Sequence, residues 1–260
     1  MIPLRKWPRA MPVAASFGFF FAGGLALGHT ALAAIHAATP DRAVAVARSR
    51  QWVGAGCQVF FDLVAALRLF DFVPRTQRWP SVPGPCVLVA NHPTLIDSPA
   101  VLSAYPQVTL IVRHDFFESP WMAPLFRRCG HLDGGDGSPR SGIDVYQQML
   151  DCLRGGGSLA VFPEGTRSRD GLGPFKRGAF RVACEADLPV VPVVLHADPP
   201  ALTGARPWWD FPVQRVHYTM DVLAPVHPAD FGHDDKALRD HVRGLYLSHS
   251  VKPHKGDTRG

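Results

Sequence analysis

The stretch "VLVANHPTLIDSPAVLS" (residues 87–103) predicts a strand, a corner and a helix in immediate succession. Its first residues form a short apolar run rich in β-branched side chains, which is typical of a buried strand. Pro93 suits the first turn of a helix, where the missing N–H of proline is no loss. His92 is therefore expected at a strand-to-helix corner, where folds often present chemistry, although a lone corner histidine is more often structural.

The same alternation of strand and helix continues along the chain. Strands are predicted at residues 86–90, 108–113, 158–162, 190–195 and 215–222. Helices are predicted at residues 94–104, 119–128, 142–154, 176–186 and 235–249. This pattern predicts an α/β fold with a largely parallel, mixed sheet flanked by helices.

Residues 1–72 predict membrane-anchoring helices that precede this domain. The uncharged stretch over about 12–38 is long enough to cross the hydrocarbon layer, which needs roughly 20 helical residues. A second hydrophobic segment, 51–72, contains charged residues and is more typical of an interfacial helix. A cleaved signal peptide is the alternative for the first stretch. Basic residues on both sides of that stretch leave open whether it spans the bilayer or dips into one leaflet, and shallow seating is favoured.

Composition shifts divide the remainder of the chain. Residues 73–85 are rich in proline and polar residues and are predicted to be a linker. The α/β domain is expected over residues 86–250, and residues 251–260 form a polar tail.

The charge and cysteine content narrow the classes of partner and site. A net charge of +5 and a pI of about 9.1 suit an anionic membrane surface, an acidic carrier protein or a phosphorylated substrate. Nucleic acid is not expected, because no basic helix or aromatic–basic interleaving accompanies the charge. Five scattered cysteines without a C-x-x-C motif indicate a reducing compartment rather than a disulfide framework. No metal site is expected, because the twelve histidines form no H-x-x-x-H or H-E-x-x-H motif.

A second informative stretch is "GGGSLAVFPEGTRSRDG" (residues 155–171), in which a short apolar strand ends in a turn suited to anions. Gly165 lets backbone N–H groups approach a ligand, Thr166 and Ser168 offer hydroxyls, and Arg167 offers a planar fork for phosphate. Lys176 follows in "FKRGAF" (175–180). The alternative is a polar loop in which Glu164 and Arg167 simply pair.

Together, "NHPTLID" and "FPEGTRS" resemble the motifs of the glycerolipid acyltransferases of the lysophosphatidic-acid type. A third block of that family, a hydrophobic strand around a proline, resembles "LPVVPVVLHA" (188–197), and the resemblance covers roughly residues 75–225. It implies transfer of a fatty acyl group from a thioester, on coenzyme A or acyl carrier protein, to the hydroxyl of a lysolipid. The leading acceptor is 1-acyl-sn-glycerol 3-phosphate, in phospholipid biosynthesis, and no cofactor is implied.

His92 is the candidate general base, because an imidazole can take the proton of an attacking hydroxyl near neutral pH. Asp97 is expected to hold the imidazole tautomer and to stabilise its charged form. Residues five apart do not share a face of an ideal helix, so the turn at Pro93 must bring the two side chains together. By resemblance, the acceptor site consists of Glu164, Gly165, Thr166 and Arg167, assisted by Lys176.

The segment "CGHLDGGDGSPRSG" (129–142) departs from the family, which carries an arginine after the glycine in this block. Asp133 and Asp136 occupy the region, and Arg140 is the candidate to replace the missing arginine. Because a neutral or cationic head group tolerates two aspartates better, a lyso-ornithine lipid, a glycolipid or a polyene lipid is an alternative acceptor.

Two other functions are weaker alternatives. A serine hydrolase would need a nucleophile elbow, and the nearest match, residues 156–160 around Ser158, lacks the final glycine and precedes a strand. A non-catalytic lipid-binding protein on this fold is disfavoured, because His92 and Asp97 are both present. Since acyl thioesters are cytoplasmic, we expect the catalytic domain on the cytoplasmic face of a bacterial-type inner membrane.

Overall fold

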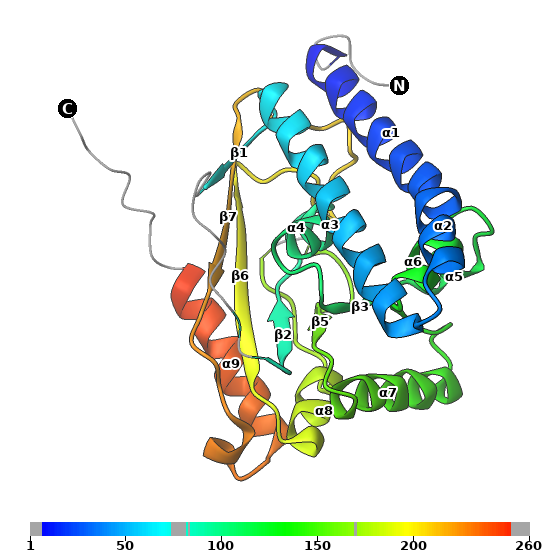
Figure 1. Ribbon diagram of the computed structural model, residues 1–260. Helices are drawn as coiled ribbons and strands as arrows, with labels where there is room; N and C mark the ends of the chain where they lie inside the picture. Colours follow the sequence, from blue (N-terminus) through cyan, green and yellow to red (C-terminus); the bar gives the residue numbers. More distant parts are fainter. Residues whose placement is uncertain (1–6, 74–81, 83, 169–170, 251–260) are drawn as a thin grey trace.

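The apolar run Val87–Ala90 forms strand β2 at the centre of a seven-stranded sheet (Figure 1). The structure is a computed structural model and describes residues 7–73, 82, 84–168 and 171–250. The spatial order of the strands is β1-β7-β6-β2-β5-β3-β4. Their bounds are β1 Phe70–Val73, β2 Val87–Ala90, β3 Thr109–Val112, β4 Leu132–Asp133, β5 Leu159–Val161, β6 Val190–Asp198 and β7 Val216–Val222.

Five of these strands, β6, β2, β5, β3 and β4, run parallel to one another, and β7 is antiparallel to β6. The carboxyl ends of the parallel strands therefore lie at one edge of the sheet, called the carboxyl edge below. Open α/β sheets bind their ligands at this edge. The predicted fold class, a largely parallel mixed sheet flanked by helices, is confirmed.

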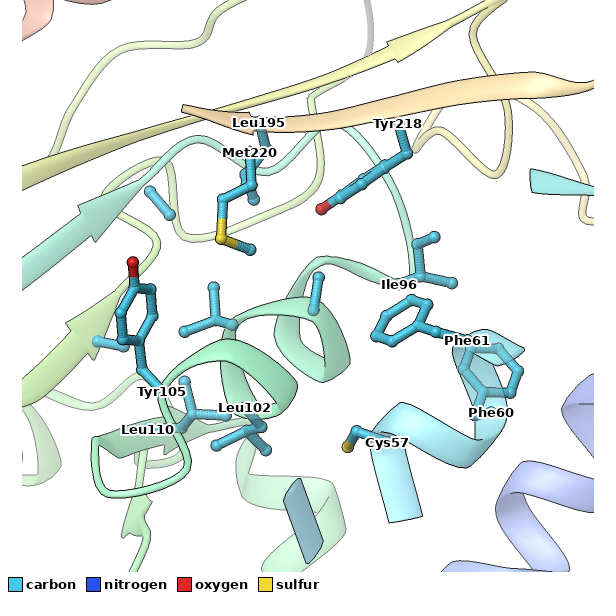
Figure 2. Packing of buried hydrophobic residues seen from close by; sticks show 14 of the residues in the cluster. Cys57, Phe60, Phe61, Ile96, Leu102, Tyr105, Leu110, Leu195, Tyr218 and Met220 are labelled. Atoms are coloured by element: carbon cyan, nitrogen blue, oxygen red, sulfur yellow. The ribbon is translucent and has the colours of Figure 1, made fainter. Parts of the chain in front are cut away.

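Helices cover both faces of the sheet (Figure 1). Those of the α/β domain are α4 Asp97–Ala104, α5 His114–Glu118, α6 Ala123–Arg128, α7 Pro139–Arg154, α8 Gly178–Ala186 and α9 Asp235–Ser250, with a 3₁₀ turn η2 at Pro228–Phe231. Alternate residues of β2 point to opposite faces, as a strand requires. Leu88 packs in a cluster with α3 and α4, shown in part in Figure 2, whereas Val87 and Val89 pack in another cluster with α7, α8 and α9.

Three helices precede the domain: α1 Trp7–His29, α2 Ala31–Ala38 and α3 Arg42–Ala66. The apolar helical segment Pro8–Ala38 is long and apolar enough to cross a membrane by length and composition. It lies beside the domain, however, because Gly28 packs against Leu125 of α6. It also packs on α3, where the ring centroids of Phe20 and Phe60 are 4.6 Å apart. Its exposed large hydrophobic side chains are Met11, Phe19 and Phe21.

The structure differs from the predicted elements after Ala66, where the sequence predicts that an interfacial helix continues to residue 72. Helix α3 ends there, Arg68 adopts a left-handed φ of 55°, and Phe70–Val73 forms a strand parallel to β7. The partner strand is more than 140 residues away, so no local pattern indicates the pairing. Much of the predicted linker, 74–81 and 83, and all of the predicted tail, 251–260, lie outside the described residues.

Two further differences are smaller. Of the predicted helix over 119–128, only residues 123–128 are helical, as α6, because residues 119–122 form a turn that contains Pro120. The short helix α5, before this turn, was not predicted. Strand β4 was not predicted, because two residues are too few to show an alternating pattern.

Candidate active site

The side chains of His92 and Asp97 meet at the carboxyl edge of the sheet. The Nδ1 atom of His92 is 2.7 Å from Oδ2 of Asp97. The contact forms because residues 91–96 are a loop and α4 begins only at Asp97, so helical geometry does not separate the two side chains. Pro93 is therefore in this loop rather than in the first helical turn, where the sequence analysis placed it.

The start of the loop is fixed by Asn91, whose side chain continues the pairing of β2 with β6. Its Nδ2 donates to the carbonyl of Leu195 at 2.8 Å, and its Oδ1 accepts from the Leu195 N–H at 2.7 Å. Asn91 thus satisfies backbone groups of β6 beyond the last residue of β2. Because His92 is the next residue, the hydrogen bonds of Asn91 also fix the position of the His92 backbone.

Asp97 is fully buried and accepts hydrogen bonds from three residues. Besides His92, Oδ2 accepts from the Thr94 N–H at 2.7 Å. The hydroxyls of Thr94 and Tyr218 donate to Oδ1 at 2.6 and 2.9 Å. Donors of this kind stabilise the ionised form of a carboxyl group. An ionised Asp97 can only accept, so Nδ1 of His92 carries the hydrogen and Nε2 of the neutral ring is free to accept a proton.

The imidazole of His92 is held on a second side by an aromatic ring. The ring of Phe162, the residue after β5, is stacked on it with centroids 4.4 Å apart and an interplanar angle of 28°. The His92 side chain is 18% exposed, so a substrate can reach it.

Glu164 joins the two motifs that the sequence analysis combined. Its buried carboxylate accepts from the His92 N–H at 2.9 Å through Oε1. Oε2 accepts from the Ser168 hydroxyl and from the Gly173 N–H, both at 2.8 Å. In return, the Ser168 N–H donates to the carbonyl of His92 at 2.8 Å. The Glu164 carboxylate is thus occupied by the protein's own donors, and its contacts are with the histidine loop.

Arg167 is half-buried, and its Nη1 donates to the carbonyl of Leu202 at 3.1 Å. Glu164 and Arg167 each have other partners, so the alternative of a simple Glu164–Arg167 pair is not what the structure contains. Leu202 belongs to the loop between β6 and β7, which therefore lies against the turn that carries Arg167.

Gly165 and Thr166 are exposed on this turn, and Lys176, just before α8, is exposed beside it. Gly165 has a φ of +73°, and a Cβ atom there would lie 2.6 Å from Nζ of Lys176. The lysine side chain therefore crosses directly over the glycine. Only glycine combines this left-handed φ with such a close approach. The turn presents a guanidinium, an ammonium group and a hydroxyl near the His92 loop.

A second histidine–aspartate pair joins Asp133 of the departing segment to His114 of α5. Nδ1 of His114 is 2.9 Å from Oδ2 of Asp133, at the carboxyl ends of β3 and β4. The hydrogen bond that His114 donates to the Asp133 carboxylate is the main reason why the pKa of His114 is raised. Asp136 accepts from the Ser138 N–H ahead of α7, and hydrogen bonds from Ser141 and Ser138 lower its pKa well below the usual range. Arg140 is exposed in the first turn of α7.

The serine-hydrolase alternative is wrong on geometry. Ser158 precedes β5 and accepts from the Cys86 N–H at 3.2 Å, at the edge of the sheet opposite to His92. Among the described residues, no group of three or more histidine, cysteine, aspartate or glutamate side chains could hold a metal ion.

Sequence reasoning missed three side chains that touch this site, Thr94, Phe162 and Tyr218. Thr94 and Phe162 lie inside the quoted motifs, so hydrogen-bonding and stacking roles could have been considered. Tyr218 lies 121 residues after Asp97, and no local pattern links the two.

Comparison with known proteins gives consistent results. Residues 73–196 match the family model described as Acyltransferase. The 1-acyl-sn-glycerol-3-phosphate acyltransferase BAT2, chloroplastic, of Brassica napus is 34% identical over 138 residues, which are 51% of this chain and 40% of that protein. The probable 1-acyl-sn-glycerol-3-phosphate acyltransferase of Mycoplasma pneumoniae is 29% identical, over 60% of this chain and 62% of that protein. This chain spans about two fifths of the length of the first curated relatives, 40% and 39%.

A solved structure extends the likeness to nearly the whole chain. The crystal structure of the 1-acyl-sn-glycerophosphate (LPA) acyltransferase PlsC from Thermotoga maritima superposes with a TM-score of 0.71. It covers 98% of this chain and 100% of that chain at 20% sequence identity, so the likeness is one of fold.

Proposed function

We propose, from the premise that residues 73–196 form a domain of the Acyltransferase family, that this chain is an O-acyltransferase that acylates a lysolipid. The leading acceptor is 1-acyl-sn-glycerol 3-phosphate, the substrate named for the curated relatives. The product would serve phospholipid biosynthesis. The observation that carries the proposal is the buried His92–Asp97 pair, joined through Glu164 to the anion-binding turn.

In the proposed reaction, Nε2 of His92 takes the proton of the acceptor hydroxyl as its oxygen attacks the thioester carbonyl. The tetrahedral intermediate then collapses, the carbon–sulfur bond breaks, and the thiolate receives the proton from the imidazolium. Asp97 stabilises the imidazolium between these two steps, as the acid of a catalytic triad does, although no protein nucleophile takes part.

The proposed acceptor site is the turn that carries Gly165, Thr166 and Arg167, with Lys176 above it. A guanidinium binds phosphate through two parallel hydrogen bonds, and an ammonium group adds a second positive charge. Glu164 was assigned to acceptor binding by resemblance. Its hydrogen bonds favour a different role, which is to hold the His92 loop and the turn at a fixed separation.

The acyl donor is proposed to be a thioester of coenzyme A or of acyl carrier protein. A phosphate-free acceptor stays the second candidate because of one observation. Asp133, in the segment where the family carries an arginine, pairs with His114 of α5, so this pair adds little net positive charge.

We further propose that the protein sits on the cytoplasmic face of a bacterial-type inner membrane. Helix α1 exposes Met11, Phe19 and Phe21, while its other side packs on α3 and, at Gly28, on α6 of the domain. This two-sided arrangement favours shallow seating over full crossing. A protease added to intact spheroplasts should leave the domain uncut, and digestion there would reject this topology.

The test of the proposed function is acyl transfer by the purified full chain in phospholipid vesicles. Acyl-coenzyme A and acyl carrier protein thioester are each supplied with 1-acyl-sn-glycerol 3-phosphate, a lyso-ornithine lipid or a lysoglycolipid. We expect His92→Ala to lower kcat by about 10²–10⁴-fold, the usual contribution of a general base. The control is His249→Ala, which removes a surface histidine 3.2 Å from Asp221 and should leave the rate unchanged. A His92→Ala variant with more than a few per cent of the wild-type rate would contradict the role of His92.

A further inference from the structure

Tyr218 is a buried tyrosine whose hydroxyl reaches the candidate active site from outside residues 73–196. It lies on β7, is 1% exposed, and its ring makes an edge contact with Phe72 of β1 at 5.6 Å. Figure 2 shows the ring projecting from β7 into the layer of side chains between the sheet and helices α3 and α4. The hydroxyl donates to Oδ1 of Asp97 at 2.9 Å.

This hydrogen bond completes a symmetrical arrangement around the Asp97 carboxylate. Oδ2 accepts two N–H groups, from His92 and Thr94, while Oδ1 accepts two O–H groups, from Thr94 and Tyr218. Burial, and next the negative charge of Asp97, raise the pKa of Tyr218 well above its ordinary value. The phenol is therefore neutral and keeps its hydrogen for donation.

The donor that Tyr218 supplies has two physical effects on Asp97. It helps to fix the orientation of the carboxylate, whose other hydrogen-bond donors are Thr94 and His92. It also withdraws electron density from the carboxylate, and so weakens the attraction of Asp97 for an imidazolium more than for a neutral imidazole.

We propose that Tyr218 is a positioning residue: by donating to the far oxygen of Asp97, it orients the carboxylate toward His92 and moderates the attraction of Asp97 for a protonated ring. The inference rests on the proposed function, because it assigns His92 the role of base. The titratable groups in contact with this arrangement are His92, Asp97, Tyr218 and Glu164, which accepts from the His92 N–H. Phe72 of β1 and Phe162 after β5 add apolar rings.

Tyr218→Phe is a sharp test, because it removes one oxygen atom and keeps the ring that packs on Phe72. The matched control is Tyr246→Phe. Tyr246 is equally buried, on α9, but its hydroxyl donates to the backbone carbonyl of Val89 and accepts from the Val193 N–H at 3.0 Å. Both variants lose a buried hydroxyl, and only one of them loses a donor to Asp97.

The measurement is the pH profile of kcat/KM for acyl transfer by the full chain in vesicles. We expect Tyr218→Phe to move the acid limb, where the rate falls as the base is protonated, upward by about 0.5–1 pH unit. The rate on the plateau should fall by less than about tenfold. Tyr246→Phe should lower the melting temperature without moving the limb. Replacement of Tyr218 by 3-fluorotyrosine, a stronger donor, should move the limb in the opposite direction.

Histidine ring NMR gives a readout that does not need turnover. In ¹³C-histidine-labelled protein, the His92 signal is assigned by its loss in His92→Gln, and its titration midpoint should rise in Tyr218→Phe. An unmoved midpoint and an unmoved acid limb in a folded Tyr218→Phe variant would overturn the inference. If the wild-type chain acylates no acceptor, the proposed function fails, and the NMR titration still decides the role of Tyr218.

Discussion

Two histidine–aspartate pairs lie at the carboxyl edge of the same sheet, His92–Asp97 and His114–Asp133, and their nitrogen–oxygen distances are nearly equal, 2.7 and 2.9 Å. Their surroundings differ. The side chains of His92 and Asp97 are 18% and 0% exposed, whereas those of His114 and Asp133 are 38% and 31% exposed. Water therefore screens the second pair much more than the first.

The difference in hydrogen bonding is as large as the difference in exposure. Besides its histidine, Asp97 is held by Thr94 and Tyr218 from two separate parts of the chain. Asp133 has its histidine and one backbone donor, the Gly135 N–H at 2.9 Å. A short His–Asp distance is therefore insufficient to identify a catalytic pair. Burial and a full set of donors set the orientation of the aspartate and confine the exchangeable proton to the histidine.

The largest expected effect separates the two aspartates. Asp97→Asn should lower kcat for acyl transfer by about 10²–10⁴-fold, because an amide can donate to Nδ1, reverse the tautomer and no longer stabilise the imidazolium. The same substitution in the exposed pair, Asp133→Asn, should change kcat by less than about twofold, since its charge is screened by water. Similar losses of kcat in both variants would contradict the view that only the buried pair, His92–Asp97, is catalytic.

A smaller effect, on KM, is expected for substitutions in the proposed acceptor site, and it tests whether the phosphate binds near Arg167 or near the His114–Asp133 pair. Arg167→Ala should raise KM for 1-acyl-sn-glycerol 3-phosphate by about 10-fold or more, because a hydrogen bond to a charged group contributes roughly 1.5–3 kcal/mol. Arg113→Ala is the matched control, since Arg113 is exposed and pairs with Asp115 at 2.7 Å. An unchanged KM for Arg167→Ala, together with a raised KM for His114→Gln, would locate the phosphate at the second pair instead.

The smallest expected effect is on stability and concerns His114. Its pKa is raised in the folded chain, chiefly by the hydrogen bond with Asp133, so the protonated form stabilises the fold. This stabilisation is fully present below the pKa of an unfolded histidine, about 6.5, and disappears as the pH rises through the folded value. His114→Gln should therefore lower the melting temperature slightly at pH 5.5 and leave it unchanged at pH 9. A difference that is equal at both pH values would show that the charge of His114 has no part in it.

Much of this protein follows from the sequence. The apolar runs at β2, β5 and β6 and the periodic segments at α7 and α9 are local patterns, and each forms within a few residues of its predicted bounds. The pairing of His92 with Asp97 was likewise predictable, because both residues lie in one short loop whose ends are fixed by a strand and a helix.

Only the tertiary structure decides the features that depend on distant partners. Phe70–Val73 is a strand because β7 lies beside it, and a segment of four apolar and acidic residues gives no such indication alone. Glu164 is a carboxylate in a polar turn, as a ligand-binding residue would be. In the fold, however, its oxygen atoms accept hydrogen bonds from His92, Ser168 and Gly173. Tyr218 reaches Asp97 only after β7 has joined the sheet. The sequence pattern indicates which residues of a helix or strand are buried, because burial repeats with the local period of that element. The hydrogen-bond donors of a buried carboxylate come from distant parts of the chain, so only the fold decides which of them lie within reach.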